Sequence, residues 1–97
     1  MMKMHAGATT TTNDKQLHRL RQLTRDYRIH RAITWLGSEN PLDRAAAIRA
    51  LAELDDPLAE IRIIRAATDT SQDPDVRQRL LDGLKYLRRK VEQGRFG

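Results

Sequence analysis

The sequence predicts an all-α fold: a short α-solenoid of two similar helix pairs, with a helical extension at the N-terminus. Three observations support this prediction. The chain of 97 residues contains an internal repeat, its three prolines all follow an Asn or an Asp, and its apolar residues recur at helical spacing. No segment alternates convincingly between apolar and polar residues, so no strand is expected.

The internal repeat joins two pairs of segments. YRIHRAIT at 27–34 matches IRIIRAAT at 61–68 at five of eight positions. After a one-residue deletion in the joining loop, residues 38–54 align with residues 71–87. A period of about 33 residues is typical of stacked helix hairpins, each of which buries its apolar side against the next. We therefore expect two copies of one structural unit.

The first helix is expected over 14–36. A capping box at Asn13 and Gln16 would begin it, and Gly37 in the left-handed conformation would end it. Its apolar residues change face at Tyr27, where the repeat begins, so the helix must pack two ways or bend, and the residues before Tyr27 are interpreted as an extension. The extension either caps the open end of the stack or docks a partner or a second copy. The face of the extension consists of Leu17, Leu20, Leu23, Thr24 and Tyr27, and the face of the repeat helix consists of Ile29, Ile33 and Leu36.

The other three helices each begin at a proline. The Asn or Asp before it can accept a hydrogen bond from a backbone N–H of the first turn, and proline leaves no N–H unpaired there. The three steps are Asn40-Pro41, Asp56-Pro57 and Asp73-Pro74. The expected helices span 41–54, 57–68 and 74 to about 91.

Apolar stripes at helical spacing predict the core. The stripe of the second helix is Ala47, Leu51 and Leu54. The third helix presents Ile61, Ile64, Ala67 and Thr68, widened by Ile63 and Ala66. The last helix presents Val76, Leu80, Leu84 and Leu87, with Leu81 at the edge. Gly83 aligns with Ala50, and because a helical glycine costs about 1 kcal/mol, we expect close helix approach there and tolerance of alanine.

Length and composition are those of one small domain. We expect 1–12 to be a flexible tail and 13–97 to form a single helical-repeat domain, with units at about 27–54 and 57–91. No apolar run approaches the roughly 18 residues of a membrane-spanning helix, and no signal peptide is recognisable. We expect no membrane association and a cytoplasmic location, with which the absence of cysteine agrees.

Charge is unevenly distributed along the chain, whose net charge is +5. Residues 1–40 hold seven basic and three acidic residues, 41–76 hold four and eight, and 77–97 hold seven and two. Basic ends thus flank an acidic middle. A protein that wraps nucleic acid presents a more continuous basic surface, so this pattern disfavours that function.

The second unit resembles HEAT-like repeats, particularly the short bacterial kind first associated with phycobilin lyases. The matching features are the Asp-Pro opening of each helix, the Asp-Pro-x-Val-Arg start at 73–77 and the small-then-Leu step at Gly83 and Leu84. The resemblance covers 56–87 well and 27–54 less well. It implies a stack of helix pairs.

In the first unit, Asp43 stands where the family usually has Val, and we expect Leu42 to fill the gap after a slight rotation of the helix. The resemblance also implies a ladder of Asp and Arg side chains that ties neighbouring units together. Arg44, Asp73 and Arg77 stand at the matching positions. Their expected role is structural.

No catalytic, cofactor-binding or metal site is expected. The sequence has no nucleophile motif, no glycine-rich phosphate loop and no His/Cys/Asp/Glu cluster with ligand spacing. His18 and His30 lie about 120° apart around a straight helix and cannot share a metal ion. The adjacent Asp55 and Asp56 are explained by helix capping.

Two basic clusters and one aromatic residue are the candidates for partner binding. The first cluster follows the helix face opposite the leucines of the extension and consists of Arg21, Arg25 and Arg28, preceded by His18. The second lies near a helix C-terminus, beside Lys85 and Arg95, and consists of Arg88, Arg89 and Lys90. Either cluster is alternatively a solvated face, and the second alternatively contacts phosphate. Trp35 is either an interface anchor or a core residue.

These observations predict a non-enzymatic protein-interaction or adaptor module that binds a protein partner through its stacked helices. Two units are fewer than the three or so of a stable array, so an apolar edge should be covered by the extension, by a homo-oligomer or by a partner. The alternative is a small nucleic-acid-binding accessory protein that uses its Arg-rich ends. A third class, an enzyme or enzyme subunit such as a bilin lyase, rests on distant resemblance alone.

Overall fold

The computed structural model describes residues 14–96, which form five helices and their connections. An N-terminal helix spans 14–21, and after it come α2 (Arg25–Leu36), α3 (Pro41–Leu54), α4 (Pro57–Thr68) and α5 (Pro74–Phe96). No strand occurs in this range, so the predicted all-α class is confirmed. The expected capping box at Asn13 and the expected tail over 1–12 lie outside the described residues.

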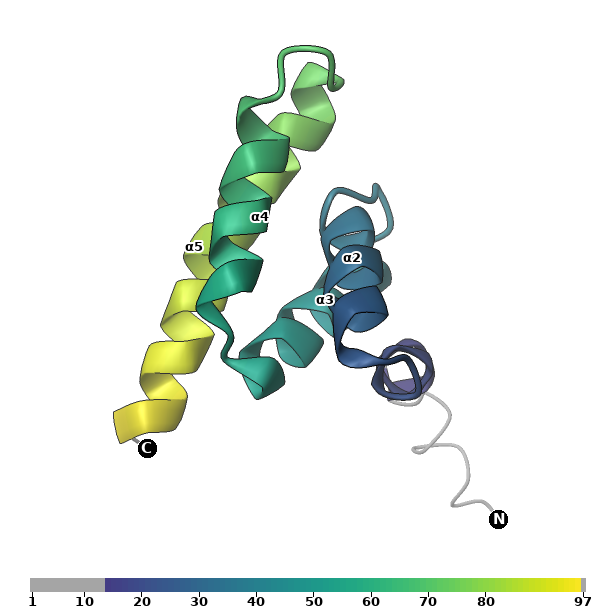
Figure 1. The fold of residues 1–97 in the computed structure, drawn as a ribbon, viewed down its shortest axis with the longest axis vertical. Coiled ribbons are helices and arrows are strands. Elements are labelled where there is room, and N and C mark those ends of the chain that lie inside the picture. The colour runs from purple at the N-terminus through teal and green to yellow at the C-terminus, as the bar shows by residue number, and fades with distance from the viewer. Residues whose placement is uncertain (1–13, 97) are drawn as a thin grey trace.

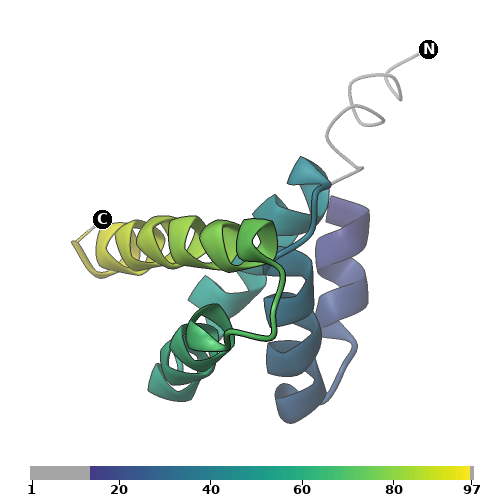
Figure 2. The ribbon, with the colours of Figure 1, turned by 90° about the horizontal axis from the view of Figure 1, so that it is seen from above.

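Helices α2 and α3 form one hairpin, and α4 and α5 form a second (Figure 1). The main contact between the hairpins is that of α3 with α5, while α2 touches α4 and α5 less extensively. The N-terminal helix lies on the side of the first hairpin that faces away from α4 and α5 (Figures 1 and 2). The second hairpin and the N-terminal helix therefore lie on opposite sides of the first hairpin.

The three helix starts predicted at prolines are confirmed. In each, a side-chain oxygen of the residue before proline accepts a hydrogen bond from the backbone N–H of the residue after it. The donor–acceptor distances are 2.9 Å at Asn40, 3.0 Å at Asp56 and 2.7 Å at Asp73. The predicted ends of α3 and α4 are also correct, whereas α5 continues past 91 to Phe96.

The single helix predicted over 14–36 is wrong, because a turn at 22–24 divides it. The N-terminal helix and α2 bury different faces in the same core. One straight helix could not turn both of these faces toward α3. The turn is closed by Arg28, whose Nη2 donates hydrogen bonds to the carbonyl oxygens of Arg21 at 2.6 Å and Leu23 at 3.0 Å. Thr24 and Tyr27, expected on the apolar face of the extension, are exposed.

The N-terminal helix is packed onto α3. Leu17 and Leu20 are fully buried, and Gln16 donates a hydrogen bond to Asp43 of α3. Asp43 also accepts a hydrogen bond from Ser38 Oγ at 3.3 Å. The predicted rotation of α3 does not occur, since Leu42 remains 38% exposed. Position 43 instead holds a polar side chain that binds the N-terminal helix.

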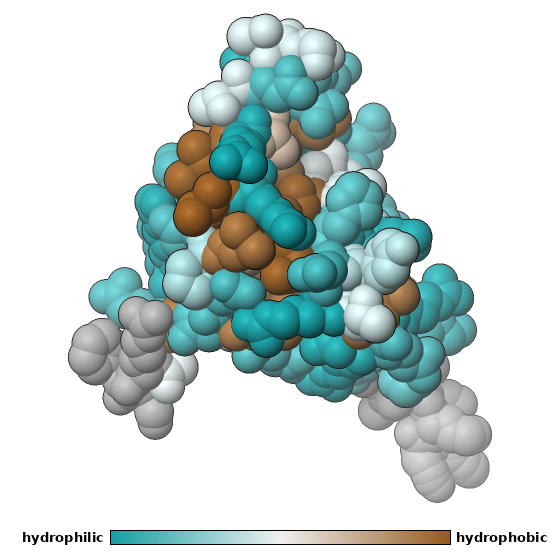
Figure 3. All heavy atoms as spheres, in the orientation of Figure 1, coloured by the Kyte–Doolittle hydropathy of each residue, from teal (hydrophilic) through white to brown (hydrophobic). Residues whose placement is uncertain are grey.

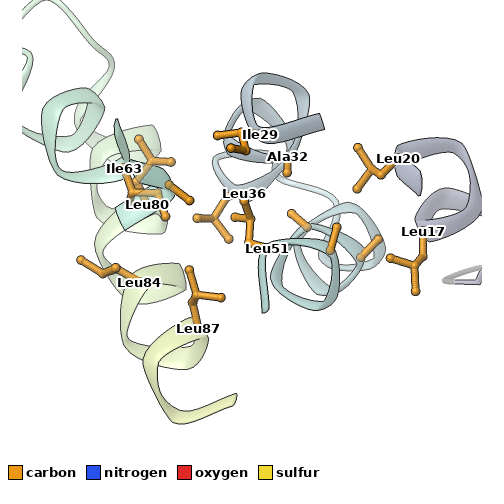
Figure 4. Close-up of a cluster of buried hydrophobic side chains, with 14 of the residues drawn as sticks. Leu17, Leu20, Ile29, Ala32, Leu36, Leu51, Ile63, Leu80, Leu84 and Leu87 are labelled. Atoms are coloured by element: carbon orange, nitrogen blue, oxygen red, sulfur yellow. The ribbon is translucent and has the colours of Figure 1, made fainter. Parts of the chain in front are cut away.

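The core is one cluster of aliphatic side chains and alanines to which every helix contributes (Figure 4). Its largest fully buried side chains are Leu17, Leu20, Ile29, Leu36, Leu51, Ile63 and Leu80. Helix α3 contributes three small residues, Ala46, Ala47 and Ala50. The predicted stripe of α5 is confirmed in that Leu80, Leu84 and Leu87 are buried and Val76 is half-buried.

The predicted inner face of α4 is correct only in part. Ile63 and Ala67 are buried as predicted, together with Ala59. Ile61 is 49% exposed and Ile64 is 41% exposed, contrary to the prediction. Helix α4 has aliphatic residues on several sides, and the position of α5 decides which of them are covered. The small residues of the buried face allow the two helices to pack closely.

Two glycines mark close approaches rather than special backbone conformations. Gly37 has a φ of −86°, so the predicted left-handed conformation is wrong; a Cβ there would lie 2.9 Å from Cγ1 of Val76. At Gly83 a Cβ would lie 2.5 Å from Cγ of Leu36, so the expectation that alanine is tolerated there conflicts with the packing. In the described chain the left-handed residue is Asp55, which ends α3 with a φ of 45°.

The arginines of the expected ladder bond within their own hairpins. Arg77 Nε donates to the carbonyl of Ala67 at 3.0 Å, and Arg44 Nη1 donates to the carbonyls of Ser38 and Glu39 at 2.8 Å each. The two hairpins are instead tied by a different arginine. Arg79 Nε donates to the carbonyl of Gly37 at 2.7 Å, and this bond holds α5 against the α2–α3 loop.

Candidate functional site

The uneven charge along the sequence is compensated in three dimensions. Each recorded ion pair of the described chain joins the acidic middle to one of the basic ends. The pairs are Arg21–Glu53, Arg25–Asp56, Arg49–Asp14 and Arg88–Glu60. Three of the fourteen basic residues of the ends, Arg21, Arg25 and Arg88, are therefore matched by carboxylates of the middle, whereas Arg49–Asp14 joins a cation of the middle to a carboxylate of the end.

The first predicted basic cluster is part of this internal network. Arg21 Nε donates to Glu53 Oε1 at 3.0 Å, and this hydrogen bond is the main reason that the pKa of Glu53 lies below its usual value. The pKa of Asp56 is also lowered, first by the backbone N–H of Leu58 and then by Arg25, at 2.9 Å from Oδ2. Arg28 closes the turn after the N-terminal helix. Arg21, Arg25 and Arg28 therefore all help to hold the N-terminal region in place.

Trp35 is half-buried and packs against the core. Its indole is therefore not an isolated surface anchor. His18, expected beside the first cluster, lies 2.9 Å from the amide nitrogen of Gln22 through its Nε2. Neither Trp35 nor His18 is part of a candidate binding surface in the structure.

The three residues of the second basic cluster, Arg88, Arg89 and Lys90, differ in their contacts. Arg88 Nη2 lies 2.5 Å from Glu60 Oε1 and connects α5 to α4. The guanidinium carbon of Arg89 lies 5.9 Å from the ring centroid of Tyr86, within the range of a cation–π contact. No carboxylate partner is recorded for Arg89 or Lys90 in the described residues, so these two cations remain available at the surface.

Arg89 and Lys90 border a groove between α3 and α5, which we call the α3–α5 groove. It consists of two adjoining hollows of about 440 and 480 Å³ that share Ala45, Ile48 and Tyr86. Its remaining lining residues are Leu36, Pro41, Arg44, Arg49, Arg79, Asp82, Gly83, Arg89, Lys90 and Gln93. Its floor is apolar and its rim is mostly basic.

A second surface lies on the side of α4 and α5 that no other helix of the described chain covers. Four aliphatic side chains, each 40% to 49% exposed, form it, and we call it the open-end patch: Leu58, Ile61 and Ile64 of α4 and Leu81 of α5. The contacts Arg77–Ala67 and Arg88–Glu60 hold α4 and α5 together as antiparallel neighbours. Figure 3 shows hydrophobic atoms gathered over α4.

Sequence reasoning named Arg89 and Lys90 as candidates, but it missed Tyr86 and the floor of the groove, and it missed the open-end patch. For the groove a signal was present, because Tyr86, Arg89 and Lys90 recur at i, i+3 and i+4 and place an aromatic ring within a basic face. For the open-end patch, the apolar spacing of α4 and α5 predicts core residues rather than a surface. Spacing alone does not tell which apolar side of α4 faces α5.

Within residues 14–96, no group of three or more His, Asp or Glu side chains is placed to hold a metal ion. None of the helices in that range is long and apolar enough to cross a membrane. Comparisons with protein-family models, with curated proteins and with solved structures find no match to this chain.

Proposed function

We propose that this chain is a non-enzymatic protein-interaction module, a short solenoid of two HEAT-like helix pairs that docks a protein partner at its open end. The observation that carries the proposal is the open-end patch. Four half-exposed aliphatic side chains on one side of a small protein are costly to leave in water, and such patches are typical of interaction sites.

The internal repeat supports this role for the patch. Leu81 aligns with Ile48 of the first unit, and Ile64 aligns with His30. Ile48 lies against α5 in the α3–α5 groove, and His30 lines a hollow between α2 and the second hairpin. Two patch residues, Ile64 and Leu81, thus correspond to residues of the first hairpin that border the second hairpin.

The two ends of the stack differ. At the first hairpin the N-terminal helix buries Leu17 and Leu20 against α3 and supplies Asp14 to Arg49, so this end is capped. At the second hairpin no described helix plays that part. The interpretation of the extension as a cap is therefore favoured, and the partner surface is assigned to the opposite end.

The proposal is tested by placing charge on the patch. The double variant Ile61→Asp/Ile64→Asp should keep its helical circular dichroism spectrum and lose a protein that co-purifies with the wild type at physiological salt, because apolar docking does not tolerate buried carboxylates. Tyr27→Asp is the matched control, since Tyr27 aligns with Ile61 and is 68% exposed on α2.

Retention of every co-purifying protein by the double variant would contradict the proposal. Sedimentation of the wild type and the double variant separates a protein partner from a second copy. A wild-type dimer that becomes a monomer in the double variant would make this patch a self-association surface instead.

The second candidate function, nucleic-acid binding, is favoured by one observation. Arg89 and Lys90 lie on the rim of the α3–α5 groove, beside Tyr86 of its floor, and basic residues beside an aromatic ring are typical of single-strand binding. The internal pairing of Arg21, Arg25 and Arg88 weighs against it, since those cations already have carboxylate partners.

A further inference from the structure

We propose that the α3–α5 groove binds an acidic amphipathic helix of a partner protein, with aliphatic side chains on the groove floor and carboxylates on its basic rim. The groove shares no residue with the open-end patch, so this inference goes beyond the proposed docking there. The two sites can be tested separately.

The floor of the groove fits aliphatic side chains. It is made by Ala45 and Ile48 of α3 and by Gly83 and Tyr86 of α5. Ala45 and Ile48 are half-buried, and Tyr86 is 58% exposed, so apolar surface remains open to a ligand. Covering it would remove apolar area from water.

The rim of the groove determines the charge of the ligand. Five cations line it, Arg44, Arg49, Arg79, Arg89 and Lys90, against one carboxylate, Asp82. Asp82 accepts a hydrogen bond from Gln78 at 3.0 Å. A partner segment that carries Asp or Glu would complement this rim, and one that carries Lys or Arg would be repelled.

The length of the groove fits a short helix. Its lining on α5 runs from Arg79 to Gln93, fourteen steps along the helix. At 1.5 Å per residue this is about 21 Å, the length of about four helical turns. A helix laid in such a groove presents its apolar residues at i, i+3, i+4 and i+7 to the floor.

The same contacts disfavour a nucleic-acid ligand. Three of the five cations already bond within the protein: Arg44 and Arg79 to backbone carbonyls and Arg49 to Asp14. Affinity for a phosphate backbone depends on the number of phosphates that Lys and Arg neutralise, and two of the five cations, Arg89 and Lys90, lack a recorded hydrogen-bond or carboxylate partner in the described residues. One face of Tyr86 is also occupied by Arg89, which leaves less of the ring for a base to stack on.

The test uses a synthetic helical peptide of about 18 residues, with leucines on one face and glutamates on both flanks, and fluorescence anisotropy at physiological salt. A peptide of the same composition in scrambled order controls for charge alone. The ordered peptide should bind the full chain, and Arg89→Glu/Lys90→Glu should weaken it by about tenfold or more.

Arg19→Glu/Arg31→Glu is the matched protein control, because it changes the net charge equally at two exposed residues with no recorded ion pair in the described chain. It should leave the affinity within about twofold. The open-end variant Ile61→Asp/Ile64→Asp should also bind the peptide normally. A loss of protein docking in that variant with intact peptide binding would separate the two proposals.

Several outcomes would overturn the inference. The first is equal binding of the ordered and scrambled peptides, which would show that the floor is not used. The second is equal weakening by both charge-reversal pairs, or no binding of the ordered peptide at about millimolar concentration. The third is tighter binding of a single-stranded oligonucleotide of matched charge, lost in Arg89→Glu/Lys90→Glu, which would assign the groove to nucleic acid.

Discussion

Gly83 of α5 lies directly against Leu36 of α2. A Cβ atom at position 83 would stand 2.5 Å from both Cγ and Cδ1 of Leu36, whose side chain is fully buried. Atoms this close must move apart, and a buried leucine has little space in which to do so. The two hairpins therefore depend on the absence of a side chain at this position.

Gly83→Ala should destabilise the protein although alanine is the better helix former. Its matched control is Gly94→Ala in the same helix, where a Cβ would meet nothing within 4 Å. Alanine gains about 1 kcal/mol of helix propensity at Gly83 in the helix interior and less at Gly94 in the last turn, so a lower stability of Gly83→Ala reports the overpacking. We expect Gly83→Ala to be about 1 to 3 kcal/mol less stable than Gly94→Ala in urea denaturation. Equal stabilities would mean that Leu36 can move aside.

Leu20→Ala should test whether the N-terminal helix belongs to the core. The leucine is fully buried, and its loss should lower the free energy of unfolding by about 2 to 5 kcal/mol. Leu42→Ala is the control, because Leu42 is 38% exposed and its change should stay within about 0.5 kcal/mol. A large effect at Leu42 with none at Leu20 would restore the rotation of α3 that the family pattern suggests.

Acid should weaken the protein partly through Glu53. Arg21 lowers the pKa of Glu53 in the folded state, below the value of about 4.3 in an unfolded chain. The ion pair therefore stabilises the fold fully above that unfolded value, and the stabilisation is lost as the pH falls through the folded pKa. Glu53→Gln should show a smaller drop in melting temperature than the wild type between about pH 6 and pH 3.

Glu39→Gln controls for the general effect of removing a carboxylate, since no ion pair is recorded for Glu39 within the described residues. Its melting temperature should follow that of the wild type over the same pH range. Parallel curves for the wild type and Glu53→Gln would show that the Arg21–Glu53 pair does not persist in solution.

Salt dependence separates the two candidate functions. If the chain binds DNA or RNA through its basic C-terminal cluster, affinity should fall steeply with salt and should weaken for all sequences alike in Arg88→Ala/Arg89→Ala/Lys90→Ala. We expect only weak binding at physiological salt, because Arg88 is paired with Glu60. Sub-micromolar, salt-sensitive binding that the triple variant abolishes would favour the nucleic-acid function.

The sequence by itself determined the helical class and the starts of α3, α4 and α5. These features are local: an Asn or Asp side chain caps a turn two residues away, and the proline between them suits that turn whatever lies elsewhere in the chain. The stripe of α5 was also readable, since Leu80, Leu84 and Leu87 leave one clear apolar face.

Only the tertiary structure decided which side of α4 is buried, where the helix at 14–36 breaks, and which arginines are free. Helix α4 carries Ile61 and Ile64 on one side and Ile63 on another, and the packed position of α5 selects Ile63. The partners of Arg21, Arg25 and Arg88 lie 28 to 32 residues away. Such pairs depend on how the hairpins pack, and this packing cannot be predicted from the spacing of charges along the sequence.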